Sequence, residues 1–142
     1  YHNTLAAPAT VKPTLGVFLE FAPIRRIHEI PVDAPDPVQE AHVKALKDNL
    51  AVFGAQGAQV LEYWLDVSWY SGYRRPPVKL PFDRSVLRAD VEFYSSLGIR
   101  HITTFAVDVD REYLELHGEP PVREYAEELM RVQQGGRAVG GC

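Results

Sequence analysis

Three apolar runs, each followed by a stretch with helical spacing, constrain what this chain can fold into. The runs lie at residues 14–22, 59–67 and 101–109, and their starts are about 43 residues apart. The first run is apolar on both faces apart from one acid, a pattern typical of a strand buried in a parallel sheet. Three strand–helix units at this spacing predict an α/β architecture with parallel strands and right-handed crossovers.

Capping signals indicate where the two longest intervening helices begin and end. Asp36 followed by Pro37 is typical of a helix start, and Gly54 of a helix end. Asp83 and Gly98 bound a second helix in the same way. Each run is therefore expected to be a strand that leads into a helix.

Two further helices are predicted in the C-terminal third of the chain. Asp110 starts a short helix through His117, and a longer helix follows the proline pair that ends at Pro121. Asp108 and Asp110 are expected to serve as turn and N-cap residues.

Composition excludes several classes of function. The 46% hydrophobic and 24% charged shares are those of a globular chain. The longest apolar stretch, at residues 16–21, is far shorter than the ~20 residues a bilayer requires, so no membrane partner is predicted. A net charge of -4 argues against a nucleic-acid partner.

No metal or cofactor is predicted either. The lone cysteine, Cys142, excludes a disulfide framework and a cysteine-based metal site, and the five histidines lack paired ligand spacing. Ser68 and Ser71 lie outside any Gly-x-Ser-x-Gly motif, and residues 54–57 lack the ending of a phosphate-binding loop.

The ends of the sequence bear on its domain organisation. The chain begins with Tyr1 and its only methionine is Met130, so we expect part of a longer protein. Residues 1–133 are expected to form one partial barrel domain, and residues 134–142 a Gly-rich flexible tail. Three strands leave open sheet edges, for which the remainder of the barrel or self-association would supply a partner.

Acidic residues interrupt the apolar runs and are the candidate catalytic groups. In a strand spanning residues 59–67, Glu62, Trp64 and Asp66 would share one face. Glu62 and Asp66 would then lie ~13 Å apart along the strand, too far for the ~5 Å pair of a retaining glycosidase. Glu20 in the first run is the candidate cross-strand partner. The structural alternatives are a buried ion pair with a strand-end arginine for Glu62, and a cap for Asp66.

The loop after the second run interleaves aromatic and cationic side chains. These are Trp69, Tyr70, Tyr73, Arg74, Arg75 and Lys79. Flat rings that stack and cations that bind oxygens suit a carbohydrate or another polar ring. Stacking of single-stranded nucleic acid is a second use of such a loop, which the net charge disfavours. A rigid proline-rich loop packed on the domain is the structural alternative.

The loop after the first run lies on the same predicted edge of the sheet. It carries Arg25, Arg26 and His28. Because ligands bind at the carboxyl ends of parallel strands, Arg25 and His28 are candidate binding residues. A hydrogen-bonded loop histidine is the alternative for His28.

Three segments also carry a resemblance to a known family. Residues 18–26 (FLEFAPIRR), 61–68 (LEYWLDVS) and 102–105 (ITTF) resemble DUF4838, a bacterial family of domains of unknown function. That family is related to glycoside hydrolases with an α-glucuronidase-like or hexosaminidase-like barrel. The similarity covers residues 1–125 and implies that the chain is the C-terminal part of a (β/α)₈ barrel, its last three strand–helix units.

The resemblance implies a glycoside hydrolase-like function on a glycan. Glu62 and Asp66 would then lie in the sugar site, with Trp64 and the 69–75 loop around it. One carboxylic acid would protonate the leaving oxygen and a second would act as nucleophile or base. The other strands of the barrel would supply further site residues, so the isolated chain could be inactive. A periplasmic or secreted setting fits the resemblance, and a cytoplasmic one stays open.

Two other functions remain open at this point. The chain could be a non-catalytic carbohydrate-binding domain or a purely structural α/β domain. The candidate residues are Glu62, Asp66 and Glu20 for catalysis, and Trp64, Trp69, Tyr73, Arg74, Arg25 and His28 for substrate binding.

Overall fold

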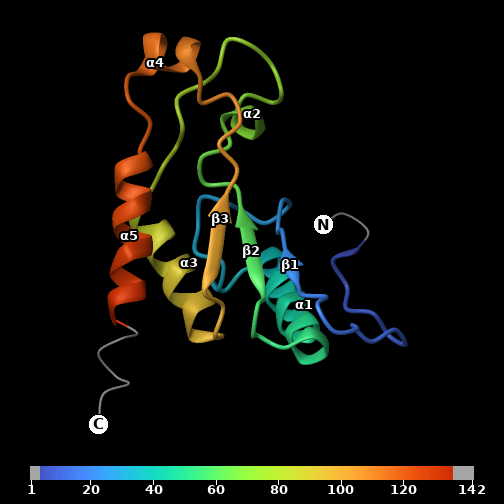
Figure 1. The fold of residues 1–142 in the computed structure, drawn as a ribbon. Helices are drawn as coiled ribbons and strands as arrows, with labels where there is room; N and C mark the ends of the chain where they lie inside the picture. The colour runs from blue at the N-terminus through green and yellow to red at the C-terminus, as the bar shows by residue number, and fades with distance from the viewer. Residues whose placement is uncertain (1–3, 136–142) are drawn as a thin grey trace.

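Three parallel strands lie at the centre of the computed structural model, which describes residues 4–135 (Figure 1). They are β1 (Glu20–Phe21), β2 (Gln59–Glu62) and β3 (His101–Thr104), in the order β1-β2-β3. Both pairings are parallel, with Gln59 aligned with Glu20 on one side and with His101 on the other. The predicted α/β class with parallel strands is therefore confirmed. The Gly-rich tail expected at residues 134–142 lies almost entirely outside the described residues.

Four of the five helices in the described residues begin where the sequence indicated. The five are α1 (Pro37–Phe53), α2 (Val67–Tyr70), α3 (Arg84–Ser96), α4 (Arg111–His117) and α5 (Val122–Gly135), of which α2 was not predicted. The Asp36 carboxylate accepts from the backbone N–H of Val38 at 2.8 Å, and the Asp83 carboxylate from that of Ser85 at 2.7 Å. These caps satisfy N–H groups that have no partner inside the helix.

The strands are shorter than the apolar runs that predicted them. β1 pairs with β2 over two residues only, and Leu15, Val17 and Phe18 before it are exposed. The apolar character of residues 14–19 thus does not make them part of the sheet. β3 ends at Thr104, and the chain then turns through Asp108, whose φ is 60°.

The second run contains a turn where a continuous strand was expected. The backbone N–H of Asp66 donates to the carbonyl of Tyr63 at 3.1 Å, and α2 begins one residue later. Glu62, Trp64 and Asp66 therefore do not share a strand face. That prediction was wrong because the apolar pattern of residues 63–67 belongs to a buried turn and the start of a helix.

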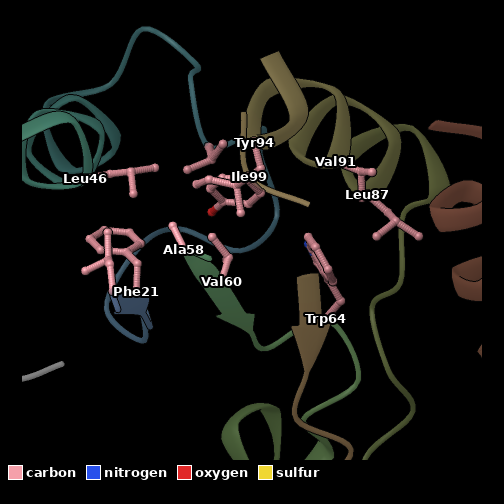
Figure 2. Packing of buried hydrophobic residues seen from close by; sticks show 11 residues of the cluster. Phe21, Leu46, Ala58, Val60, Trp64, Leu87, Val91, Tyr94 and Ile99 are labelled. Atoms are coloured by element: carbon pink, nitrogen blue, oxygen red, sulfur yellow. The ribbon is translucent and has the colours of Figure 1, made fainter. Parts of the chain in front are cut away.

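The main core lies between the sheet and the helices on one of its faces. Phe21 and Val60 from the strands pack with Leu46 of α1 and with Leu87 and Val91 of α3 (Figure 2). Both helices lie behind the sheet in Figure 1. The strand order is sequential, and α1 and α3 cover one face of the sheet.

The opposite face of the sheet is more open to solvent. Its residues are Glu20, Gln59, Leu61, His101 and Thr103, all exposed or half-buried. A second, smaller core covers the ends of the strands, where Leu65, Val67, Leu80 and Tyr113 are buried together. Along the part of the chain that the structure describes, no helix is long and apolar enough to cross a membrane.

Candidate functional site

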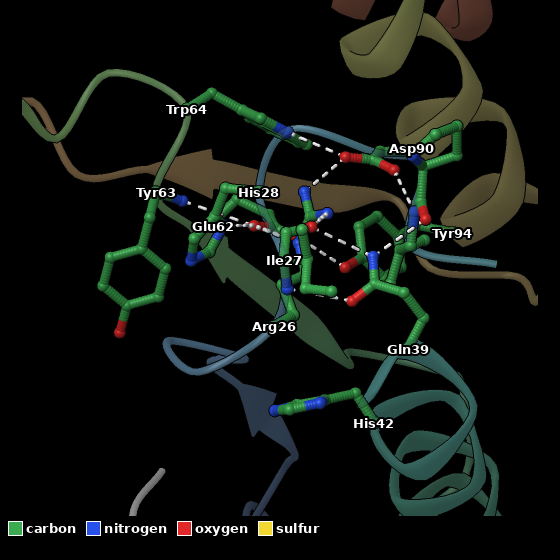
Figure 3. A network of polar contacts seen from close by, with 12 residues as sticks. Arg26, Ile27, His28, Gln39, His42, Glu62, Tyr63, Trp64, Asp90 and Tyr94 are labelled. Atoms are coloured by element: carbon green, nitrogen blue, oxygen red, sulfur yellow. Dashed lines mark hydrogen bonds and ion pairs between the residues drawn. The ribbon is translucent and has the colours of Figure 1, made fainter. Parts of the chain in front are cut away.

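A buried arginine organises the carboxyl end of the sheet. Arg26 lies in the loop after β1, and its Nε donates to Glu62 Oε1 at 3.1 Å (Figure 3). Its Nη2 lies 2.5 Å from Asp90 Oδ2, and all three side chains are 0% exposed. Its Nη1 donates to the carbonyls of Ile27 and Ile30. Every nitrogen of the guanidinium is therefore engaged.

The carboxylates of Glu62 and Asp90 each accept further hydrogen bonds from other segments of the chain. The Tyr94 hydroxyl of α3 donates to Glu62, the last residue of β2. Asp90 of α3 accepts from Trp64 Nε1 at 2.9 Å and from the backbone N–H of Val32 at 2.6 Å. The cluster thus joins the loop after β1, the end of β2 and the middle of α3.

A glutamine of α1 holds the same loop. The Gln39 Oε1 accepts from the backbone N–H of Ile27 at 3.0 Å, and its Nε2 donates to the carbonyls of Ile27 and Pro31 at 3.1 and 2.8 Å. Gln39 is buried, so these bonds replace those that water would make. The loop that carries Arg26 is consequently held from both helices.

Burial and charge shift the pKa values in this cluster. Burial raises the pKa of Asp90 to about 7, although Arg26 pulls it down. Burial lowers the pKa of Arg26, but attraction to Glu62 and Asp90 outweighs this and the net pKa is raised. Burial and the neighbouring Glu62 raise the pKa of Tyr94, so its hydroxyl stays a donor.

His28 borders the cluster on the side away from α3. Its Nε2 lies 3.0 Å from the Ile24 carbonyl oxygen, and its Nδ1 lies 3.9 Å from Glu62 Oε2. The ring packs against Tyr63 and Trp69, with centroids 5.6 and 5.9 Å away. Burial lowers the pKa of His28, which favours the neutral imidazole.

The structure does not bring the three predicted catalytic carboxylates together. Glu62 points to the helix-covered face and is paired with Arg26, the buried ion pair that was its structural alternative. Asp66 is buried and caps α2, where it accepts from Ser68 Oγ at 2.5 Å and from the backbone N–H of Trp69 at 3.2 Å. Glu20 is exposed and aligned with Gln59, which places it on the other face of the sheet.

The predicted binding residues divide into two groups. Trp64 is 5% exposed and belongs to the main core. Trp69 is half-buried and meets the ring of Tyr73 edge-on at 6.3 Å, and Tyr73 is 67% exposed. Arg74 and Arg25 are exposed.

A line of rings follows the carboxyl ends of all three strands. Phe105 stacks on Tyr63 with centroids 5.1 Å apart, Tyr63 contacts His28, and His28 contacts Trp69, which contacts Tyr73. We call these five residues the aromatic row. Phe105 follows β3 directly, Tyr63 follows β2 directly, and His28 lies in the loop after β1. Each strand thus delivers one ring to the same edge of the sheet.

One cation of the loop after β2, Arg75, is already engaged by acidic side chains. Arg75 pairs with Asp108 at 2.8 Å, Asp110 at 2.6 Å and Glu112 at 2.7 Å. Asp110 also caps α4, since it accepts from the backbone N–H of Tyr113 at 3.2 Å. The turn and cap roles predicted for Asp108 and Asp110 are confirmed.

Three residues of the buried cluster around Arg26 were not predicted as site residues. Asp90, Tyr94 and Gln39 all lie on helix faces that point to the core. Asp90 is three residues after Leu87 and four before Tyr94, so an acid on an apolar helical stripe was the available signal.

The described part of the chain offers no candidate metal site. Among residues 4–135, no group of three or more His, Cys, Asp or Glu side chains could hold a metal ion.

The fold and the edge define an α/β protein with a parallel sheet and an aromatic row at its carboxyl end. Comparison with protein-family models, curated proteins and solved structures finds no match to the chain.

Proposed function

We propose that this chain recognises a glycan with the exposed end of the aromatic row, and that Glu62 and Asp66 stabilise the fold instead of reacting. One observation carries the proposal. The candidate carboxylates are buried and engaged, whereas Tyr73 is 67% exposed beside Trp69 at the carboxyl edge of the sheet.

The chemistry of this edge suits a sugar. The C–H face of a pyranose packs on an aromatic ring, and nearby cations donate to its hydroxyl oxygens. Trp69 and Tyr73 supply the rings, and the exposed Arg74 follows Tyr73 in the chain. Arg25 is exposed on the loop after β1, which also ends at this edge.

Hydrolysis, the function that the resemblance to DUF4838 implies, is the less favoured candidate. To act as an acid or nucleophile, Glu62 would have to leave Arg26 and Tyr94 and reach solvent. Separating one member of a buried ion pair costs about 3–5 kcal/mol. Recognition needs no such rearrangement.

Binding to a panel of soluble oligosaccharides tests the proposal. Tyr73→Ala and Trp69→Ala should each weaken binding by about fivefold or more, since stacking on an aromatic ring contributes about 1 kcal/mol. Phe18→Ala is the matched control, because Phe18 is an exposed aromatic on the other side of β1. Near neutral pH, Glu62→Gln should bind as the wild type does. Equal weakening by Phe18→Ala, or no binding to any oligosaccharide, would overturn the proposal.

We further propose that the open face of the sheet packs against additional strands, as in a barrel. Its residues are Glu20, Gln59, Leu61, His101 and Thr103, and no strand pairs with the outer side of β1 or β3 in the described residues. Unpaired strand edges favour association with other strands. Light scattering should therefore detect association of the isolated chain. A monomer that unfolds cooperatively would contradict this proposal.

A further inference from the structure

One buried nitrogen at the edge of the sheet has no hydrogen-bond partner. His28 is 5% exposed, and its Nδ1 accepts from and donates to nothing among the described residues. Its Nε2 faces the carbonyl oxygen of Ile24 at 3.0 Å, and only an N–H can donate there. In the neutral ring, Nδ1 therefore carries a lone pair. That lone pair faces the carboxylate oxygen of Glu62 across 3.9 Å (Figure 3).

The charges of the buried cluster do not balance. Glu62 and Asp90 are two carboxylates, and Arg26 is the one cation that contacts them. Oxygens of both carboxylates already accept hydrogen bonds, from Arg26, Tyr94 and Trp64 among others. A net buried charge is costly to hold in a low-dielectric interior. One added proton would make the cluster neutral, and Asp90, whose pKa burial raises to about 7, competes with His28 for it.

We propose that His28 is a second proton-binding site of this cluster, beside Asp90, and that the proton on His28 strengthens the contact between the cluster and Trp69. A proton taken from solvent binds the Nδ1 lone pair, and the resulting N–H points to Glu62 as an ion pair. While Asp90 is ionised, the cluster then holds two cations and two anions. No bond other than N–H forms, and no redox partner is needed.

The charge on the ring strengthens its packing against the aromatic row. The rings of Tyr63 and Trp69 lie 5.6 and 5.9 Å from the His28 ring, within the ~6 Å reach of cation–π attraction. Trp69 in turn contacts Tyr73, the exposed ring of the row. Protonation of His28 should therefore hold Trp69 more firmly at the edge of the sheet.

The charged and buried groups around His28 set the pH range in which its ring binds a proton. Burial lowers the pKa of His28, Glu62 from β2 raises it, and Arg26 and Glu29 from its own loop act in opposite directions. Tyr70 of α2 stays neutral, because burial raises its pKa. Proton uptake by the folded protein thus falls below the ordinary histidine value of ~6.5.

NMR of the full chain tests the proposal without any glycan. The ring signals of His28 and the two tryptophan indole N–H signals are followed from about pH 8 to about pH 5, where histidines titrate. We expect His28 to titrate below ~6.5 and the Trp69 indole to shift with it. Glu62→Gln should lower the His28 midpoint, because the attracting charge is gone. Glu112→Gln, which removes an exposed acid elsewhere, should leave the midpoint unchanged.

Two results would overturn the inference. The first is that the His28 ring does not titrate in this range, or that its midpoint is the same in Glu62→Gln. The second is that the Trp69 indole signal does not move while His28 titrates. His28→Gln should abolish the Trp69 shift. The effect on glycan affinity rests on the proposed function. Wild type should bind the glycan about threefold more tightly at the acidic end of the pH range, and His28→Gln should show no such increase. If no glycan binds but both NMR shifts occur, the proposed function fails and this inference stands.

Discussion

Arg26 and Glu62 lie 36 residues apart in the chain and form an ion pair in which both side chains are fully buried. The Nε of Arg26 is 3.1 Å from Glu62 Oε1, and Nη2 of the same guanidinium binds Asp90 on α3. This pair connects the loop after β1 with the end of β2. It gives Glu62 a structural role at the position where a catalytic acid was expected.

Arg26→Met is expected to destabilise the protein strongly. The variant leaves the carboxylates of Glu62 and Asp90 buried without a cation, and breaking a buried pair in this way costs about 3–5 kcal/mol. Urea denaturation measures the loss in the free energy of unfolding. Arg75→Met is the matched control, since Arg75 pairs with three acids at the surface, and its effect should be far smaller. Equal effects would show that burial of the pair is unimportant.

Asp66→Ala and Asp66→Asn should differ from one another. Asp66 accepts from Ser68 Oγ and from the backbone N–H of Trp69, and Asn can accept the same bonds. Loss of the cap in Asp66→Ala should cost about 1 kcal/mol in the free energy of unfolding, and Asp66→Asn much less. Thermal and urea unfolding provide the measurement. A glycan-binding defect that is as large in Asp66→Asn as in Asp66→Ala would indicate that the charge itself is required.

Glu128→Gln should make the free energy of unfolding depend less on pH in the acid range. The Glu128 carboxylate accepts from Arg84, Arg88 and Arg131, and the hydrogen bond from Arg88 has the largest share in lowering its pKa. The pKa of Glu128 in the folded protein lies below its ordinary value of 4.5. The ionised carboxylate therefore stabilises the fold fully above that pH, and this stabilisation disappears as the pH falls through the folded pKa.

The difference between wild type and Glu128→Gln isolates this effect from other titrating groups. Urea midpoints near neutral pH should be higher in wild type, and the gap should narrow below ~4.5. A gap that stays constant across this range would mean that ionisation of Glu128 contributes nothing. Glu92→Gln, which affects a mostly exposed acid on Arg131, is a suitable comparison.

Leu87→Ala tests the core between the sheet and α3. Leu87 is fully buried, so the substitution leaves a cavity and should cost about 2–5 kcal/mol in the free energy of unfolding. Leu15→Ala is the matched control, since Leu15 lies on the surface and its truncation should change stability by less than ~0.5 kcal/mol. A Leu15→Ala effect of similar size would mean that residues 14–19 pack against a surface of another chain or copy.

The helices were predictable from the sequence because their signals are local. Asp36, Asp83 and Asp110 each accept from a backbone N–H two or three residues further along, and the apolar stripes that follow have helical spacing. Such interactions depend on neighbours in the chain. The parallel direction of the strands followed from the alternation of strand and helix.

The ends of the strands were not predictable in the same way. Residues 63–67 are as apolar as a strand, but they form a turn and the start of α2. Periodicity cannot separate a buried strand from a buried turn, since both bury every side chain. The face toward which Glu62, Trp64 and Asp66 point was consequently decided by the turn.

The sequence alone thus determined the class of this protein, an α/β chain with three parallel strands and capped helices. Tertiary structure decided what its acids do. Glu62 meets Arg26 across 36 residues, and Arg26 meets Asp90 across 64. Whether a carboxylate reacts or stabilises depends on burial and on the charges around it, which come from segments distant in the chain.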